Sequence, residues 1–287
     1  MPQLCLRQQL LCCASLLFSI SIPTAHALVV ADHDDSIDST NDPGGIPWDY
    51  VGNRGFGSAV YLCDGWVITA GHVGEGAFDL MGTTYQIDQS INSGTGRYMV
   101  DGSLDLMMFR LVGDPGLAGM EVTSETNMSG NEVSMIGYGL PESGYQDNNT
   151  AFRNDDYYTW GARAKSWGTN VVDAEGFNNS GHSLFITDFD HHLSNGATAF
   201  EAQATNGDSG SGIFYNNGGI WELAGITVTV NTSDSTRTSI GDQTLAIDLA
   251  SYKTQIDTIK TFDPVPEPSS TLLAGITALL LLQRRRR

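Results

Sequence analysis

Gly207-Asp208-Ser209-Gly210-Ser211-Gly212 is the most informative stretch of this sequence. A second run, Thr69-Ala70-Gly71-His72-Val73, lies upstream at the end of an expected strand. Between the two, Asp105 opens an apolar run that ends at Leu111. His, Asp and Ser in this chain order favour a nucleophilic serine hydrolase, because a serine hydroxyl needs an adjacent base to take its proton.

The chemistry gives each of these residues a role. His72 is the candidate base, and later the acid that protonates the leaving amine, while Asp105 would hold its imidazole in the right tautomer. The backbone amides of Gly207 and Ser209 would form the oxyanion hole. Asp101 is a rival for Asp105, but the apolar run begins directly after Asp105.

Short strands and turns rich in Gly, Asn and Asp dominate the rest of the chain. The clearest signal is a hairpin formed by Ser58–Leu62 and Trp66–Ala70. Further strands are expected at Thr84–Ile87, Arg97–Val100, Asp105–Leu111, Glu132–Gly137, Tyr157–Ala164, Gly212–Tyr215, Glu222–Val230 and Gln243–Asp248. One helix is expected at Leu249–Phe262, where apolar residues recur at spacings of three and four. Two polar segments, Asp32–Gly45 and Gly139–Asn149, are interpreted as loose.

This pattern, over residues 28–262, resembles the chymotrypsin-like serine proteases. Three motifs carry the resemblance: Thr69-Ala70-Gly71-His72 is close to the family's T-A-A-H, Asp105-Leu106-Met107-Met108 to D-I-A-L, and Gly207-Asp208-Ser209-Gly210 to G-D-S-G. The resemblance implies an all-β fold of two six-stranded antiparallel β-barrels with a C-terminal helix. It also implies a serine endopeptidase that cleaves polypeptides through an acyl-enzyme. A catalytically silent binding protein and an esterase with the same three residues remain alternatives.

The resemblance implies a substrate pocket as well. Gln203 aligns with the residue at the base of the S1 pocket, and Val228-Thr229-Val230 aligns with the substrate-binding strand. Gln203 is uncharged, and branched Val230 stands where the family has glycine. We therefore expect small or uncharged P1 side chains rather than Lys or Arg.

Activation in this family buries a new N-terminal ammonium beside the aspartate that precedes the nucleophile, which is Asp208 here. No I-V-G-G sequence is present. Cleavage after Ala27 would nevertheless expose Leu28, at a distance from His72 close to that of the family. We expect Leu28 to pair with Asp208.

The N-terminal segment, residues 1–27, is typical of a secretory signal peptide. It carries Arg7, then an apolar run from Leu10 to Ile20, then Ala25-His26-Ala27 as a small-x-small cleavage site. The apolar run is too short to span a bilayer comfortably. The protein is therefore expected to be exported.

The C-terminal segment, residues 263–287, resembles the PEP-CTERM sorting signal of Gram-negative bacteria. It contains Pro266-Glu267-Pro268, an apolar stretch from Leu272 to Leu282 and the cluster Arg284–Arg287. The arginines favour the cytoplasmic side of the inner membrane, so the tail would anchor the protein transiently. The resemblance implies an exosortase as partner and a final place at the cell surface or outside the cell.

Charge and cysteine content fit an exported domain without cross-links. Of the 14 basic and 33 acidic residues, nine basic and 32 acidic ones lie between Leu28 and Pro264. Such a negative field repels nucleic acid. Three of the four cysteines lie in the signal peptide, so Cys63 has no partner for a disulfide within the domain.

Metal sites are weakly indicated. The aspartates of the acidic segment could bind Ca²⁺ as a structural ion, but they lack the Gly and terminal Glu of an EF-hand loop. Asp188-Phe189-Asp190-His191-His192 is a short cluster that suggests zinc, although an exposed polar loop is the more ordinary interpretation. We expect no catalytic metal and no cofactor.

Overall fold

Continuous apolar runs form the centre of a first lobe, residues 48–111. β3 (Gly57–Cys63), β4 (Trp66–Ala70) and β8 (Leu106–Arg110) pair antiparallel, and nearly all of their residues are buried. The sheet has the order β6-β5-β2-β3-β4-β8-β7. Its outer strands are β2 (Val51–Arg54), β5 (Phe78–Leu80), β6 (Thr83–Tyr85) and β7 (Arg97–Met99).

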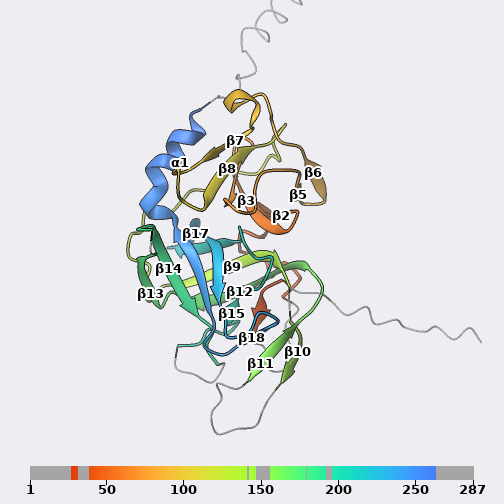
Figure 1. The fold of residues 1–287 in the computed structure, drawn as a ribbon, viewed down its shortest axis with the longest axis vertical. Coiled ribbons are helices and arrows are strands. Elements are labelled where there is room, and N and C mark those ends of the chain that lie inside the picture. The colour runs from red at the N-terminus through yellow and green to blue at the C-terminus, as the bar shows by residue number, and fades with distance from the viewer. Residues whose placement is uncertain are drawn as a thin grey trace, which may run out of the picture.

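The computed structural model describes residues 27–31, 39–140, 142–146, 156–178, 180–191 and 196–262. Figure 1 shows them as two lobes stacked along the long axis. The second lobe, residues 132–248, holds a sheet of the order β12-β9-β16-β17-β19-β14-β13. Its strands are β9 (Glu132–Gly139), β12 (Ala164–Val171), β13 (Ala174–Phe177), β14 (Ser183–Asp188), β16 (Gly212–Asn217), β17 (Ile220–Asn231) and β19 (Gln243–Asp248).

Two smaller sheets extend the second lobe. β1 (Val29–Val30) pairs with β15 (Ala202–Gln203). β10 (Glu142–Gln146), β11 (Tyr157–Trp160) and β18 (Arg237–Ser239) form a three-stranded sheet at the far end of this lobe (Figure 1). β10 lies in a segment that we expected to be loose, so that expectation was wrong.

The chain returns to the first lobe through its C-terminal helix. A 3-10 turn, Leu249–Tyr252, leads into α1 (Lys253–Lys260), and Asp248 caps the turn by accepting from the Ala250 amide. The buried residues of this segment include Ile256 and Ile259, which lie on the apolar face that the sequence predicts. One apolar core joins this face to both lobes.

The expected all-β fold class with a C-terminal helix is confirmed. Each main sheet has seven strands where six were expected. In each sheet one short strand, β6 or β13, adds to an edge by pairing with its hairpin partner. β12 and β14 are absent from the expected strands, although both are central to the second lobe.

No helix within the described ranges is long and apolar enough to cross a membrane. The expected apolar tail helix, Leu272–Leu282, and residues 1–26 of the expected signal peptide lie outside those ranges. Cys63 is a free cysteine, as expected.

Candidate active site

His72 and Asp105 come from neighbouring strand ends of the first lobe. β4 ends at Ala70 and β8 begins at Leu106, and these two residues are paired. His72 Nδ1 lies 2.7 Å from Asp105 Oδ2, and the His72 amide donates to Asp105 Oδ1 at 2.7 Å. Strand pairing therefore places the carboxylate so that it fixes both the ring and the backbone of His72.

This contact shifts the titration of both groups. The hydrogen bond to Asp105 raises the pKa of His72 above its ordinary value, although burial acts the other way. Partial burial acts to raise the pKa of Asp105, but the hydrogen bonds from His72 outweigh it and the net direction is downward. The lowered pKa favours an ionised Asp105, which could stabilise an imidazolium on His72.

Ser209 lies in the nucleophile loop, residues 204–211, between β15 and β16. The Ser58 amide donates to Ser209 O at 2.7 Å. A Cβ on Gly57 would lie 2.7 Å from Ser209 O and equally close to Val73. The backbone of Ser209 and the residue after His72 therefore meet at Gly57, which brings the expected nucleophile and base to one place between the lobes.

No hydrogen bond joins Ser209 Oγ to His72 within the described residues. Bonds of this kind often tighten only when substrate is bound. His72 is about half exposed, with a side-chain exposure of 48%, so its ring is open to solvent and to an incoming peptide.

The amides around Ser209 divide into two sets. Those of Asp208, Gly210 and Ser211 donate to backbone carbonyls of Thr205, Thr227 and Asp208. Those of Gly207 and Ser209 donate to no described residue. Gly207 has φ +97, a conformation that glycine adopts without steric cost. Two free amides flank the hydroxyl, which is the donor set that an oxyanion hole requires.

Asp208 is completely buried behind this turn. Its Oδ2 accepts from the Thr205 amide at 2.8 Å and from the Thr205 hydroxyl, whereas Oδ1 has no partner among the described residues. Burial raises the pKa of Asp208 to about 7, against the opposing charge of Arg163. A Cβ on Gly137 or Gly139 would clash with the carboxylate, so both positions require glycine.

Leu28 is buried beside the strand that leads into the nucleophile loop. Val29 pairs with Gln203, so the preceding backbone runs toward residues 204–208. The Leu28 carbonyl accepts from Ser166 Oγ at 3.5 Å. No hydrogen bond or ion pair joins Leu28 to Asp208 among the described residues, and their pairing stays a prediction.

The expected pocket residues lie on two neighbouring strands. Gln203 is fully buried, its Oε1 accepts from Thr244 Oγ1 at 3.0 Å, and its Nε2 has no partner among the described residues. Val228 and Val230 are half-buried on β17, where the pairing with β19 slips by one residue between Thr227 and Thr229. The P1 preference that we drew from these residues stays a prediction.

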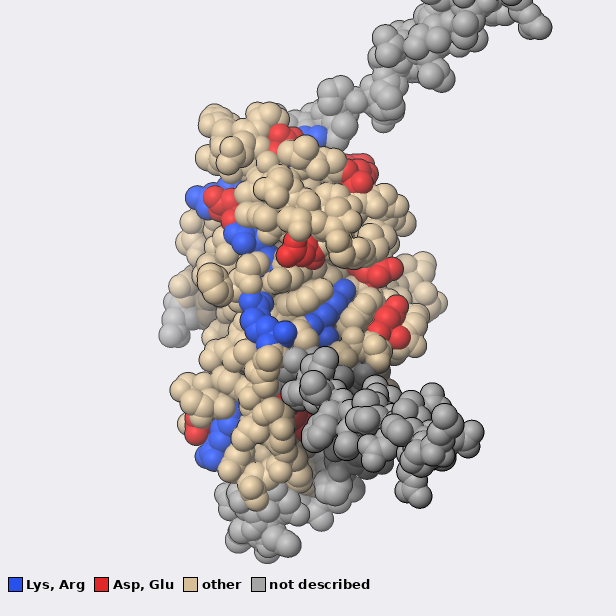
Figure 2. All heavy atoms as spheres, turned by 90° about the vertical axis from the view of Figure 1, so that its right-hand side faces the viewer, with Lys and Arg blue, Asp and Glu red and all other residues tan. Residues whose placement is uncertain are grey.

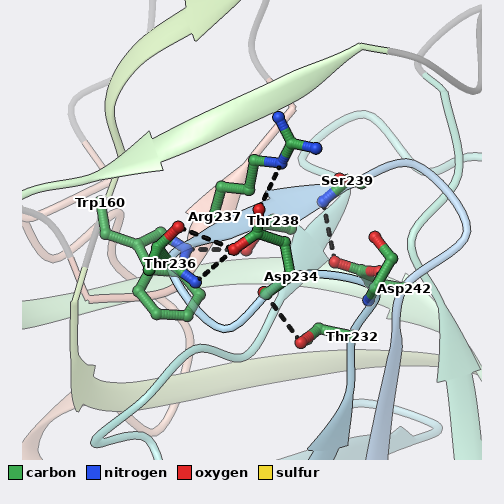
Figure 3. Close-up of polar contacts among 9 residues, drawn as sticks. Trp160, Thr232, Asp234, Thr236, Arg237, Thr238, Ser239 and Asp242 are labelled. Atoms are coloured by element: carbon green, nitrogen blue, oxygen red, sulfur yellow. Dashed lines mark hydrogen bonds and ion pairs between the residues drawn. The ribbon is translucent and has the colours of Figure 1, made fainter.

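The loop after β17 is tied down by its own polar groups (Figure 3). Asp234 accepts from Thr236 and forms an ion pair with Arg237 at 3.1 Å. Asp242 accepts from the Ser239 amide, and Trp160 Nε1 donates to Thr238 Oγ1. These bonds hold the loop against β18 and join β18 to β11 within the three-stranded sheet.

Sequence reasoning missed Arg163, Lys165 and Thr205. Arg163 donates to the carbonyls of Tyr138 and Gly207, and Lys165 donates to those of Trp48 and Val51. The scarcity of basic residues was the signal that could have singled out the two cations. Nothing local marks Thr205, because its role depends on Asp208.

The metal interpretations gain no support. Within the described ranges no group of three metal-ligating side chains occurs. Asp42 accepts from the Gly44 amide, whereas residues 32–38 and His192 lie outside those ranges. Phe189 and His191 are buried, so the cluster that they belong to is not the exposed loop we expected. The structural calcium stays an untested prediction.

Comparison with known proteins finds two matching family models. The family model described as Trypsin matches residues 39–256, and the model described as the PEP-CTERM protein-sorting motif matches residues 264–287. No curated protein matches the chain.

Two solved structures illustrate the likeness. The HtrA-type protease AlgW with a decapeptide is 20% identical, with a TM-score of 0.44, and the match covers 70% of this chain. The chain spans about half of that protein, 52%. Neuropsin, a serine protease expressed in the limbic system of mouse brain, is 16% identical, with a TM-score of 0.48, and the match covers 74% of this chain and 95% of neuropsin.

Proposed function

Because the chain belongs to the trypsin family of serine-type endopeptidases, we propose that His72, Asp105 and Ser209 form its catalytic triad and cleave peptide bonds in polypeptide substrates. The observation that carries this proposal is the pair of hydrogen bonds between His72 and Asp105 beside a serine flanked by two free amides.

Each residue has one task in the reaction. Ser209 Oγ attacks the scissile carbonyl while His72 Nε2 takes its proton. The amides of Gly207 and Ser209 receive the oxyanion of the tetrahedral intermediate. His72 then protonates the leaving amine, and water hydrolyses the acyl-enzyme by the same steps. Asp105 stays ionised throughout and keeps Nε2 facing Ser209.

In the proposed activation, Asp208 Oδ1 would accept a hydrogen bond from the new N-terminus. Oδ1 is a buried acceptor without a partner among the described residues. An ammonium on Leu28, created by cleavage after Ala27, would supply the missing donor. The pairing of β1 with β15 supports this proposal, because it leads the chain toward the nucleophile loop.

The PEP-CTERM motif indicates export and sorting to the surface. We divide the chain into a signal peptide (1–27), a protease domain (28–262) and a sorting segment (263–287). The tail would hold the protein transiently in the inner membrane until an exosortase-type enzyme acts on it. The mature protein would then act at the cell surface or outside the cell.

A fluorophosphonate probe tests the proposal. The processed wild-type protein should be labelled, Ser209→Ala should not, and Ser233→Ala should be labelled like the wild type, because Ser233 is an exposed serine of the same lobe. A processed wild type that takes no label and cleaves nothing would support a catalytically silent binding protein instead.

Matched substrates refine the activity. Peptide amides and the corresponding esters, each with Ala, Gln, Arg or Lys at P1, should be compared. Amide cleavage with preference for the uncharged residues is expected. Cleavage of esters alone would indicate an esterase, and strong cleavage after Lys or Arg would contradict the assigned pocket.

A further inference from the structure

Arg163, between β11 and β12, donates only to backbone carbonyl oxygens. Its Nε and Nη2 bind Tyr138 O, and its Nη1 binds Gly55 O. Nη2 also reaches Gly57 O at 3.2 Å and Gly207 O at 3.4 Å. Arg163 forms no ion pair with any residue that the structure describes. Its hydrogen bonds therefore hold backbone, although its charge also favours the ionised form of the buried Asp208.

The four carbonyls belong to both lobes. Gly55 and Gly57 lie in the β2–β3 hairpin of the first lobe, Tyr138 lies on β9, and Gly207 opens the turn that carries the nucleophile. A planar guanidinium offers five donors in a fixed fork, so one side chain can fix several carbonyls at once.

The same hairpin also holds the nucleophile. The Ser58 amide donates to Ser209 O at 2.7 Å, and Gly57 lies so close to Ser209 that a Cβ there would meet its carbonyl at 2.7 Å. The hairpin therefore touches the nucleophile loop at two points, at Ser209 directly and at Gly207 through Arg163.

Gly207 depends on this contact for its orientation. Gly207 has φ +97 and no side chain. Rotation of its peptide groups is therefore resisted only by contacts with neighbouring residues. The Arg163 Nε lies 3.3 Å from the place that a Cβ on Gly207 would occupy. On the far side of the residue, the Gly207 amide donates to no described group.

We propose that Arg163 is a positioning residue for the oxyanion hole: by binding the Gly207 carbonyl and the hairpin carbonyls together, it keeps the Gly207 amide turned toward the reacting carbonyl. The inference rests on the proposed function, since it requires Ser209 as nucleophile. Arg163 touches no reacting atom and acts through Gly207.

The test compares Arg163→Ala and Arg163→Lys with Arg237→Ala as the matched control. Arg237 is an arginine of the same lobe that has a carboxylate partner, Asp234, and stacks on Tyr157. For each processed protein, kcat, KM and the inhibition constant of a peptide aldehyde should be measured. The aldehyde adduct carries an oxyanion, so its affinity reports on the hole itself.

Removing an oxyanion donor outright costs about 10² to 10³ in kcat, so loss of a positioning residue should cost about 10- to 100-fold. We expect this loss in Arg163→Ala with KM nearly unchanged, an equal weakening of aldehyde binding, and recovery of activity with millimolar ethylguanidinium. Arg163→Lys should lose less, and Arg237→Ala should match the wild type in every readout.

A kcat within twofold of the wild type in Arg163→Ala would overturn the inference. So would a loss that appears equally in KM and is not restored by ethylguanidinium. If Arg163→Ala does not fold, Arg163→Lys is judged by the same kcat and aldehyde readouts. An inactive wild type would instead overturn the proposed function, and the inference with it.

Discussion

The first lobe holds the proposed base and its orienting carboxylate at the ends of two buried apolar strands, whereas the second holds the proposed nucleophile in a loop fixed by polar side chains. The carboxylates in and near the site differ accordingly, although hydrogen bonds from Thr236 lower the pKa of Asp234, which lies in a second-lobe loop outside the site. In the first lobe the pKa values of Asp88 and Asp105 are lowered. In the second lobe burial raises the pKa of Asp208 and of Glu201 to about 7.

The difference shows how each half of the site is kept in place. Packing of β4 and β8 fixes the residues near their ends, His72 and Asp105, and both side chains stay open to solvent. A glycine-rich loop has no core of its own, so buried polar groups must hold it, at the expense of their solvation. The substitutions described next test the apolar packing of the first lobe and the buried polar contacts of the second separately.

The largest effect is expected from Asp105→Asn. The amide would hold His72 in the wrong tautomer, and kcat should fall by about 10⁴-fold. Losing the carboxylate should also lower the pKa of His72, so the acid limb of the kcat/KM profile should move to lower pH from a midpoint above the ordinary 6.5. Asp101→Asn, the rival position, should leave rate and profile unchanged. Equal losses in the two variants would refute the assignment of Asp105.

A pair of glycine substitutions compares the lobes directly. Gly139→Ala would place a methyl 2.2 Å from Asp208 Oδ2, and Gly52→Ala would place one 2.4 Å from Phe78. Both should destabilise the fold by about 1 to 3 kcal/mol, as overpacking does. Gly139→Ala should also lower kcat at least tenfold, because Asp208 lies next to Ser209, whereas Gly52→Ala should keep the rate per folded molecule.

Urea unfolding and active-site titration measure the two quantities separately. Gly176→Ala is the control, since nothing lies within 4 Å of a Cβ at that position. A rate loss in Gly52→Ala as large as that in Gly139→Ala would erase the distinction between the lobes.

Asp208 should give the second lobe its own pH dependence. In a chain that retains Ala27, the unfolded carboxyl ionises near 3.8 but the folded one only near 7. The unfolded state therefore binds fewer protons between these values, and the free energy of unfolding should fall as pH rises from about 4 to about 7. Asp208→Asn should remove that component of the fall.

The chain that begins at Leu28 should lack this component too, because an ammonium beside Asp208 favours the ionised carboxylate. Urea midpoints measured across this pH range for both chains, each with and without Asp208→Asn, decide the point. Identical slopes for the two chains would contradict the pairing of Leu28 with Asp208.

Lys165→Met should give the smallest of these effects. Lys165 Nζ donates to the carbonyls of Trp48 and Val51 at 2.6 Å and lies 4.3 Å from the Trp48 ring centre. Met keeps the bulk but leaves both carbonyls without this donor, which should cost about 1 to 3 kcal/mol of stability. Lys260→Met, which removes an ion pair with Asp257, should cost less than about 1 kcal/mol. Urea denaturation measures both, and equal costs would argue against Lys165 as a tie between the lobes.

The sequence predicts the first lobe better than the second. β4, β8 and the residues at their ends are evident from continuous apolar runs, because such strands are buried on both faces. β12 and β14 were not predicted because polar residues such as Ser166, Asn170 and Thr187 are buried within them. Ser166 and Asn170 donate to carbonyls distant in sequence, which the sequence pattern does not show. Gln203 could be aligned, but its burial against Thr244 could not be foreseen.

Figure 2 shows basic side chains gathered at the waist between the two lobes, with acidic ones above and beside them. The hydrogen bonds of Arg163 to Gly55 and Gly57 join segments more than 100 residues apart in the sequence. The sequence spacing does not predict a contact between residues so far apart, so this contact is seen only in the structure.

Cys63 is the only cysteine among the described residues, and it is free. A protease acting outside the cell, as proposed for this chain, would meet other copies of itself, and digestion proceeds through molecules that have opened. Because no disulfide cross-links the described residues, the time that the enzyme survives digestion depends on the height of its unfolding barrier. Reducing agents should not shorten that time. Because residues 28–262 contain one cysteine, their refolding involves no choice between alternative disulfides. The yield of active enzyme should therefore be the same in a buffer without thiols and in a reducing buffer.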